Sequence, residues 1–114
     1  MDMLDTAFIL IVEDERSHGE AIKEGLERTG HACRLVESGD EAVVSIQERP
    51  PHVVVTDYRL GGRMNGLDVL RAARKLNPWT QVILITAHGD ERLARDALKV
   101  DGAFAYLPKP LDLE

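Results

Sequence analysis

The sequence Val53-Val54-Val55-Thr56-Asp57 is a short, unbroken run of β-branched residues that ends on a carboxylate. Short apolar runs bounded by turn residues are typical of strands that are buried on both faces of a sheet. Three further runs have the same form and end on residues that can bind metal or phosphate: 8–12 before Glu13-Asp14, 82–85 before Thr86, and 104–108 before Lys109. If the strands are parallel, these endings meet at one edge of the sheet, where the ligands of open α/β sheets bind.

Stretches with helical periodicity separate these runs, and a weaker, more polar strand is expected at 32–36. This alternation predicts an α/β fold with a five-stranded parallel sheet, helices on both faces and right-handed crossovers. A fifth helix is expected after Pro110, but only four residues follow, so the chain is either part of a longer polypeptide or leaves the sheet partly bare. The expected helices, with their apolar stripes, are 15–29 (Ala21, Ile22, Leu26), 38–49 (Ala42, Val43, Ile46), 66–76 (Leu67, Leu70, Ala73) and 90–100 (Leu93, Ala97, Leu98).

Length and composition narrow the class of protein. A chain of 114 residues fits one domain with a single core. Its net charge of −6 argues against nonspecific binding to nucleic acid or anionic membranes by this segment. Cys33 is the only cysteine, which excludes an internal disulfide and a cysteine-based metal site. No basic start followed by a long apolar stretch is present, so a cytoplasmic protein without a membrane span is expected.

The acidic strand endings call for a cation. Glu13, Asp14 and Asp57 would repel one another by about 3 kcal/mol per pair at a separation of about 5 Å and an effective dielectric of about 20. Carboxylate oxygens with remaining water positions suit Mg²⁺ or Mn²⁺ better than Ca²⁺. A carboxylate beside such an ion can attack phosphorus to form an acyl phosphate, and the Lys109 ammonium and Thr86 hydroxyl can bind phosphoryl oxygens. Because no nucleotide-binding motif occurs, a phosphorylated protein or small phosphodonor is expected rather than ATP.

Four segments carry these residues in a highly specific order and spacing: Ile11-Val12-Glu13-Asp14-Glu15, Val55-Thr56-Asp57-Tyr58-Arg59-Leu60, Ile85-Thr86-Ala87-His88, and Gly102-Ala103-Phe104-Ala105-Tyr106-Leu107-Pro108-Lys109-Pro110. With them the chain resembles the receiver domain of a bacterial two-component response regulator, related to the chemotaxis and nitrogen-regulation receivers. The resemblance covers about residues 7–110. It implies a flavodoxin-like fold with strand order 2-1-3-4-5 and a single receiver domain over 1–114, the N-terminal part of a longer protein.

The resemblance also implies a role for each site residue. Asp57 would accept the phosphoryl group of a kinase's phosphohistidine. Asp14 and Asp57 would bind Mg²⁺ directly, Glu13 through water, and Arg59 through its backbone carbonyl. Thr86 and Tyr106 resemble the switch pair, in which the hydroxyl moves toward the phosphoryl group and the ring follows inward, while the Lys109-Pro110 bond resembles the family's cis peptide.

The implied partners are a sensor histidine kinase or phosphotransfer protein and an output domain in the same polypeptide. The ending at 106–112 is similar to that of receivers fused to DNA-binding transcription activators, although hybrid kinases have comparable endings. The surface of the fourth helix and fifth strand is expected to change its affinity for partners, and a homodimer through it is a further option.

The loop after Asp57 departs from the family pattern. It lacks the usual proline before the glycine and is one residue longer, over 60–66. Arg59 and His88, two positions beyond Asp57 and Thr86, stand where receivers tune the access of water to the acyl phosphate. Their bulk predicts slow hydrolysis.

Two other functions remain open at this point. An aspartyl-nucleophile phosphatase also places an aspartate at a strand end beside Mg²⁺, but such enzymes carry a second aspartate where this chain has Arg59. A degenerate receiver that only binds proteins is disfavoured by the intact acidic trio and Lys109. The four histidines have no metal-ligand spacing, so surface or loop roles are expected for His18, His31, His52 and His88.

Overall fold

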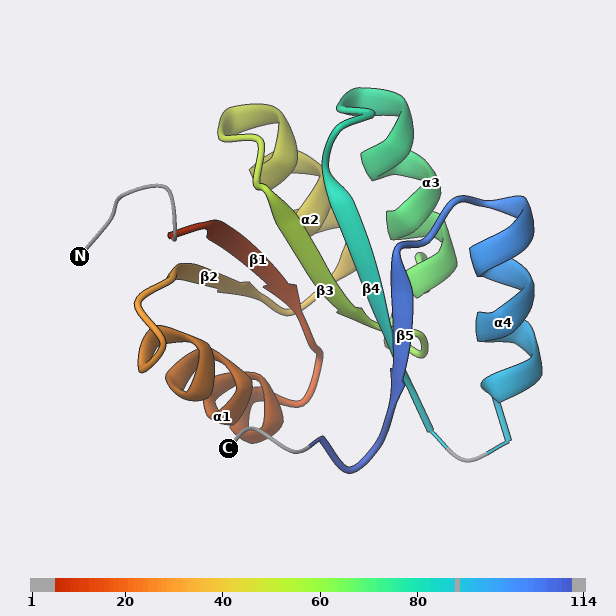
Figure 1. Ribbon diagram of the computed structural model, residues 1–114, viewed down its shortest axis with the longest axis horizontal. Helices are drawn as coiled ribbons and strands as arrows, with labels where there is room; N and C mark the ends of the chain where they lie inside the picture. Colours follow the sequence, from red (N-terminus) through yellow and green to blue (C-terminus); the bar gives the residue numbers. More distant parts are fainter. Residues whose placement is uncertain (1–5, 88, 112–114) are drawn as a thin grey trace.

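The computed structural model describes residues 6–87 and 89–111, which form a parallel sheet with helices on both faces (Figure 1). The strand order is β2-β1-β3-β4-β5, as the resemblance to the receiver family implies. The Lys109-Pro110 peptide bond is cis, which is also as predicted. The elements are β1 (Phe8–Val12), α1 (Arg16–Glu27), β2 (Ala32–Val36), α2 (Gly39–Glu48), β3 (Val53–Asp57), α3 (Gly66–Leu76), β4 (Gln81–Thr86), α4 (Glu91–Val100) and β5 (Ala105–Pro108).

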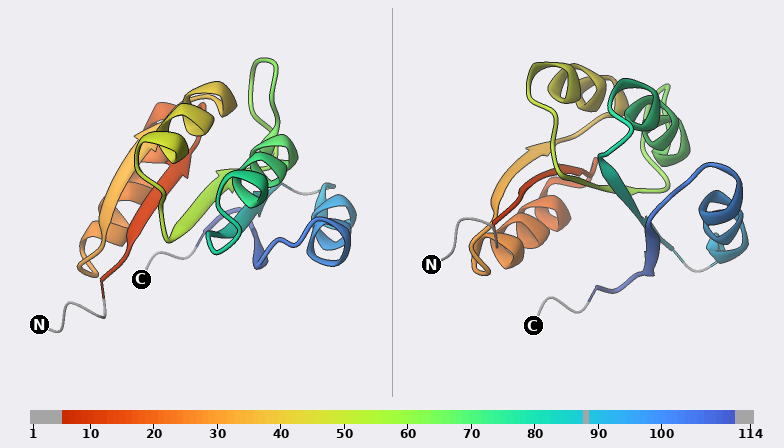
Figure 2. Two further views of the ribbon diagram at one scale, coloured as in Figure 1. Left: turned by 90° about the horizontal axis from the view of Figure 1, so that it is seen from above. Right: turned by 45° about the horizontal axis from the view of Figure 1, so that its top comes forward.

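The sheet separates two apolar clusters, because neighbouring side chains of a strand point to opposite faces. Leu10 and Val12 of β1 face the larger cluster, which is covered by α2, α3 and α4, whereas Ile9 and Ile11 face a smaller one beneath α1. Figure 2 shows α1 on one side of the sheet and α2 and α3 on the other. The three central strands are therefore buried on both faces, as expected from their unbroken apolar sequences.

One residue is wrong in each of two predicted helix stripes, while Ile22 and Leu26 in α1, and Ala97 and Leu98 in α4, lie on the buried face as predicted. Leu93 is 48% exposed, and the buried face of α4 consists of Ala94 and Ala97. In α1, Ala21 is exposed while Ile22 is buried. In both helices the predicted stripe extends one residue too far around the helix, since a period of 3.6 residues does not by itself fix the edges of the buried face.

The edge strand β5 departs from the expectation of burial on both faces. Phe104, just before it, is 64% exposed and Leu107 is 43% exposed. In the described part of the chain β5 pairs only with β4, and helical cover reaches it from α4. Leu111 packs against the cluster beneath α1, and the expected fifth helix lies outside the described residues. Within residues 6–87 and 89–111, no helix has the length and apolar character that crossing a membrane requires.

The register of the strands aligns the polar endings. Val12 pairs with Thr56, Asp57 with Ile85, and Thr86 with Pro108. Glu13, Asp57, Thr86 and Lys109 therefore emerge at the same carboxyl edge of the sheet, although up to 96 positions separate them in the sequence numbering. This confirms the expectation that the endings meet.

Candidate functional site

An ion pair between Lys109 and Asp57 forms the centre of this edge. The Lys109 Nζ atom lies 2.5 Å from Asp57 Oδ2 and 3.7 Å from Glu13 Oε1. Asp57 is only 4% exposed, so its carboxylate is screened little by solvent. Burial by itself lowers the pKa of Lys109, but the hydrogen bond and charge of Asp57 outweigh it and raise that pKa above its ordinary value of 10.5. The lysine is therefore a fixed positive charge beside the carboxylate at neutral pH.

Glu13 is the most deeply buried of the three acids, at 1% exposed. Burial raises the pKa of Glu13 above its ordinary value, and the nearby charge of Asp57 raises it further, while hydrogen bonds from His18 and the Glu15 backbone oppose the shift. Its two oxygens have different partners. Oε2 accepts a hydrogen bond from the Glu15 backbone N–H at 3.3 Å, and Oε1 contacts His18 Nδ1 and faces Lys109.

Asp14 is exposed and is directed toward the loop that follows β3. Its Oδ2 atom accepts a hydrogen bond from the Gly61 N–H at 2.8 Å. That bond lowers the pKa of Asp14 below its ordinary value, and partial burial opposes the shift only in part. Asp14 thus carries a negative charge at neutral pH and ties the first strand's ending to the loop.

Thr86 is completely buried at the end of β4. Its Oγ1 has no hydrogen-bond partner among the described residues, an uncommon situation for a buried hydroxyl. Leu84, two residues earlier, pairs with Tyr106 across β4 and β5. Because alternate residues share a sheet face, Thr86 and Tyr106 lie on the same face, and Tyr106 packs half-buried against the larger cluster.

The loop between β3 and α3 is anchored to the site at both ends. The Arg59 N–H donates to Asp57 Oδ1 at 3.3 Å, and the Gly66 N–H donates to the Tyr58 carbonyl at 2.8 Å. The Arg59 guanidinium makes a bidentate pair with Asp90, which precedes α4, at 2.8 and 2.9 Å. This pair spans two loops at the sheet edge, and sequence analysis did not foresee it, since Asp90 was taken only as the start of a helix.

Three side chains could hold a metal ion together: Glu13, His18 and Asp57 each place one ligand atom within 4.8 Å of the others. The expectation of a surface or loop role for His18 is therefore wrong, because its ring reaches the buried Glu13 from the first turn of α1. The sequence did carry one signal of this position. His18 comes four residues after Asp14, so it falls in the first turn of a helix that starts soon after the first strand and lies near that strand's end. His88, which was expected to tune hydrolysis, lies outside the described residues.

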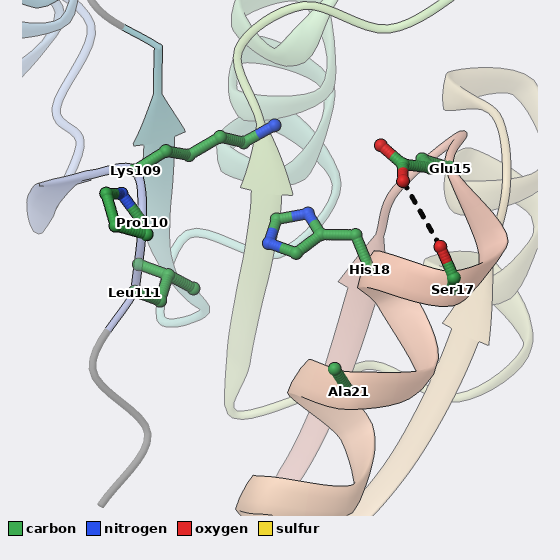
Figure 3. Close-up of a pocket in the computed structure, with 7 residues that line it drawn as sticks. All are labelled: Glu15, Ser17, His18, Ala21, Lys109, Pro110 and Leu111. Carbon is green, nitrogen blue, oxygen red and sulfur yellow. Dashed lines mark hydrogen bonds between the residues drawn. The ribbon is translucent and has the colours of Figure 1, made fainter.

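A pocket of about 590 Å³ lies beside this group, between α1 and the segment after β5. Figure 3 shows the His18 ring projecting from α1 toward Lys109 and Pro110. The lining combines charged and apolar side chains from the two segments: Glu15, Ser17, His18, Ala21, Lys109, Pro110 and Leu111. The pocket meets the site at His18 and Lys109, the two lining residues that contact Glu13 and Asp57.

Known proteins share both this sequence and this fold. A family model described as the response regulator receiver domain matches residues 9–114. The DNA-binding transcriptional regulator NtrC of Salmonella typhimurium is 32% identical over 111 residues, which are 97% of this chain and 23% of NtrC. The transcriptional regulatory protein ZraR of Escherichia coli O157:H7 is 36% identical over 110 residues, 96% of this chain and 24% of ZraR.

Solved structures agree with the sequence comparisons. A response regulator receiver domain protein from Clostridium thermocellum is similar with a TM-score of 0.88 at 36% identity, covering 94% of this chain and 85% of that protein. NtrX from Brucella abortus is similar with a TM-score of 0.89 at 32% identity, covering 95% of this chain and 24% of NtrX. The chain therefore spans about a quarter of NtrC, ZraR and NtrX. It belongs to the family of response regulator receiver domains.

Proposed function

We propose that this domain is a phosphoacceptor switch in which Asp57 receives a phosphoryl group from the phosphohistidine of a sensor histidine kinase or phosphotransfer protein. The observation that carries the proposal is the buried Asp57 carboxylate paired at 2.5 Å with Lys109 at the carboxyl edge of the sheet. Asp57 Oδ attacks phosphorus, the O–P bond forms, and the P–N bond to the donor imidazole breaks. The product is an aspartyl phosphate on this chain, so the domain acts as a signalling switch and not as a turnover enzyme.

Mg²⁺ is the metal proposed for the acidic edge, with Mn²⁺ as an alternative. The donor set fits a hard divalent ion, since Glu13, Asp14 and Asp57 offer carboxylate oxygens at one edge of the sheet. Asp14 and Asp57 would bind the ion directly, Glu13 through water, and Arg59 through its backbone carbonyl. When bound, the ion neutralises charge on the phosphoryl group during transfer.

Two residues are proposed to respond to the phosphoryl group. Lys109 exchanges its bond to Asp57 Oδ2 for one to a phosphoryl oxygen, which keeps the ammonium paired. Thr86 gains the acceptor that its buried hydroxyl lacks among the described residues. Tyr106, on the same sheet face, then moves inward and changes the surface of α4 and β5. Phosphorylation in this way biases an equilibrium between two packings of the domain.

The output is proposed to be transcriptional. NtrC and ZraR are transcriptional regulators, and this chain matches about a quarter of each. We infer that residues 1–114 are the N-terminal receiver of a longer cytoplasmic protein whose output domain is in the same polypeptide. Leu93 of α4 and Phe104, just before β5, are exposed apolar side chains that offer contacts for that domain or for a second copy of the receiver.

Mass measurement tests the phosphoacceptor proposal. Wild-type protein incubated with acetyl phosphate and Mg²⁺ should gain the mass of one phosphoryl group, and chelation of the metal should suppress the gain. Asp57→Asn should gain none, because an amide cannot form the acyl phosphate. Equal gains by wild type and Asp57→Asn would refute the assignment, whereas continuous release of phosphate from many equivalents of an ester would favour a phosphatase.

Arg59 is expected to prolong the life of the aspartyl phosphate. Its guanidinium is held by Asp90 across the edge of the site, and its bulk is expected there to restrict the approach of water. Arg59→Ala should therefore shorten the phosphoryl lifetime severalfold, on the order of threefold or more, as measured by the decay of the mass gain after the donor is removed. Arg63→Ala is a matched control, because Arg63 lies in the same loop but pairs with the exposed Asp40 at 2.6 Å. A lifetime unchanged by Arg59→Ala, or shortened equally by both changes, would contradict this role.

A further inference from the structure

We propose that His18 supplies a nitrogen ligand to the metal site, so that this receiver binds Mn²⁺ and related transition ions in preference to Mg²⁺. The inference rests on the metal site of the proposed function and changes it in three respects: His18 is added as a ligand, Glu13 binds the ion directly rather than through water, and the preferred ion is a transition ion. Neither the acidic trio nor the match to the receiver family assigns a role to this histidine.

The geometry of three side chains carries the inference. His18 Nδ1 contacts Glu13 Oε1, and both atoms lie within 4.8 Å of a carboxylate oxygen of Asp57. An ion placed among three such atoms would have a nitrogen and two oxygen donors on one side, and it would share Asp57 and Glu13 with the Lys109 ammonium. Glu13 and Asp57 are at most 4% exposed, so little bulk water competes with the imidazole there.

The local sequence holds His18 in this position. The next residue is Gly19, and a Cβ atom there would lie 2.6 Å from Leu35 Cδ1 and 3.4 Å from Glu13 Cβ. The absence of that Cβ lets the first turn of α1 pack closely against β1 and β2, which brings the His18 ring to the strand ending. The Glu15 N–H binds Glu13 Oε2 and so leaves Oε1 directed toward His18 and Lys109.

A second observation at the same edge also points to a ligand. Thr86 Oγ1 is completely buried and has no hydrogen-bond partner among residues 6–87 and 89–111. Buried hydroxyls rarely lack a hydrogen-bond partner, and where the protein offers none, a water molecule, an ion or a ligand group usually binds them. The carboxyl edge therefore contains a buried polar group that the described protein atoms leave without a hydrogen-bond partner.

The chemistry of the donor set determines which ion is favoured. Oxygen ligands with several waters suit Mg²⁺, whereas an imidazole nitrogen favours transition ions, whose affinity for nitrogen donors rises from Mn²⁺ toward Ni²⁺. For the nitrogen to bind, the ring proton must be on Nε2, and the ion then takes the place of the present contact between His18 and Glu13. A receiver without this histidine would offer oxygen donors alone.

Pulsed electron paramagnetic resonance of the Mn²⁺-loaded 114-residue chain tests the proposal directly. Wild-type protein should show the nitrogen coupling of a bound imidazole, and His18→Gln and His18→Met should lose it. His31→Gln is the control and should keep it, because His31 accepts the Ala7 N–H at the opposite end of β1. Calorimetric titration should show that His18→Gln weakens Mn²⁺ binding about tenfold while changing Mg²⁺ binding by less than about twofold.

The possible failures are distinguishable. Bound Mn²⁺ without nitrogen coupling in wild type, or coupling that survives in both His18 variants, would overturn the role of His18 and leave the phosphoacceptor proposal intact. No binding of either ion, together with no mass gain from acetyl phosphate, would overturn the metal site itself and with it the proposed function.

Discussion

Replacing Gly66 by alanine is expected to lower the free energy of unfolding by about 3 kcal/mol and to slow phosphorylation of Asp57 by about tenfold or more. A Cβ atom at residue 66 would lie 2.3 Å from the Asp57 carbonyl oxygen and 2.8 Å from Tyr58 Cα. Both are backbone atoms, so no side chain can rotate away to relieve the overlap. The Gly66 N–H also donates to the Tyr58 carbonyl at 2.8 Å. Moving the start of α3 away from the end of β3 to make room for the Cβ atom would therefore also break this hydrogen bond.

Urea unfolding and the initial rate of the mass gain measure the two effects. Gly61→Ala is the matched control in the same loop, because a Cβ atom there would meet only Asp14 Oδ2, at 3.1 Å. It should change the unfolding free energy by less than about 1 kcal/mol. Equal losses in the two variants would show that the close approach of α3 to Asp57 is not what requires glycine at residue 66.

Lys109→Met is expected to slow phosphorylation of Asp57 by about a hundredfold, since it removes the cation that contacts the carboxylate and would bind a phosphoryl oxygen. It should also destabilise the metal-free protein by about 2 kcal/mol. This loss of stability is smaller than the loss expected on breaking a fully buried ion pair, because the lysine side chain is 30% exposed. The raised pKa of Lys109 means that its stabilising charge is present at neutral pH and is lost only as the pH rises through that value, in strongly alkaline solution.

A double variant separates charge balance from other effects of the substitution. Lys109→Met combined with Asp57→Asn removes both charges of the 2.5 Å pair, so most of the stability lost in Lys109→Met should return. Thermal unfolding in the presence of a chelator measures this. Losses that simply add in the double variant would mean that the ion pair does not contribute to folding.

The sheet and the convergence of its endings could be predicted because both depend on local sequence. An unbroken run such as 53–57 has few alternatives to a buried strand, and parallel pairing then brings Asp57 to the same edge as Glu13 and Lys109. The resemblance to the receiver family implied a role for each site residue, and those roles stay predictions. The start and end of α3 were predicted to the residue, since Asn65 caps it and Pro78 follows it closely.

The side-chain pairs of the site could not be predicted in the same way. The pairing of Arg59 with Asp90 joins residues 31 positions apart on two loops, and no periodicity reports such a contact. His18 has no ligand spacing to another histidine, and its position shortly after Asp14 indicates only that it lies near the end of the first strand. Its contact with Glu13 depends on the close packing that Gly19 permits. The exposure of Leu93 depends on which row of α4 meets the sheet, and that row is set by tertiary packing rather than by helix period.

Mapping of the modified residue tests the central claim most directly. Protein treated with acetyl phosphate and Mg²⁺ is reduced with borohydride, which converts an aspartyl phosphate to homoserine, and is then digested and sequenced by tandem mass spectrometry. The account predicts homoserine at residue 57 and at no other acidic position in wild type, and none in Asp57→Asn. Conversion at Asp14 or at Glu13 to the corresponding alcohol, with residue 57 unchanged, would contradict it.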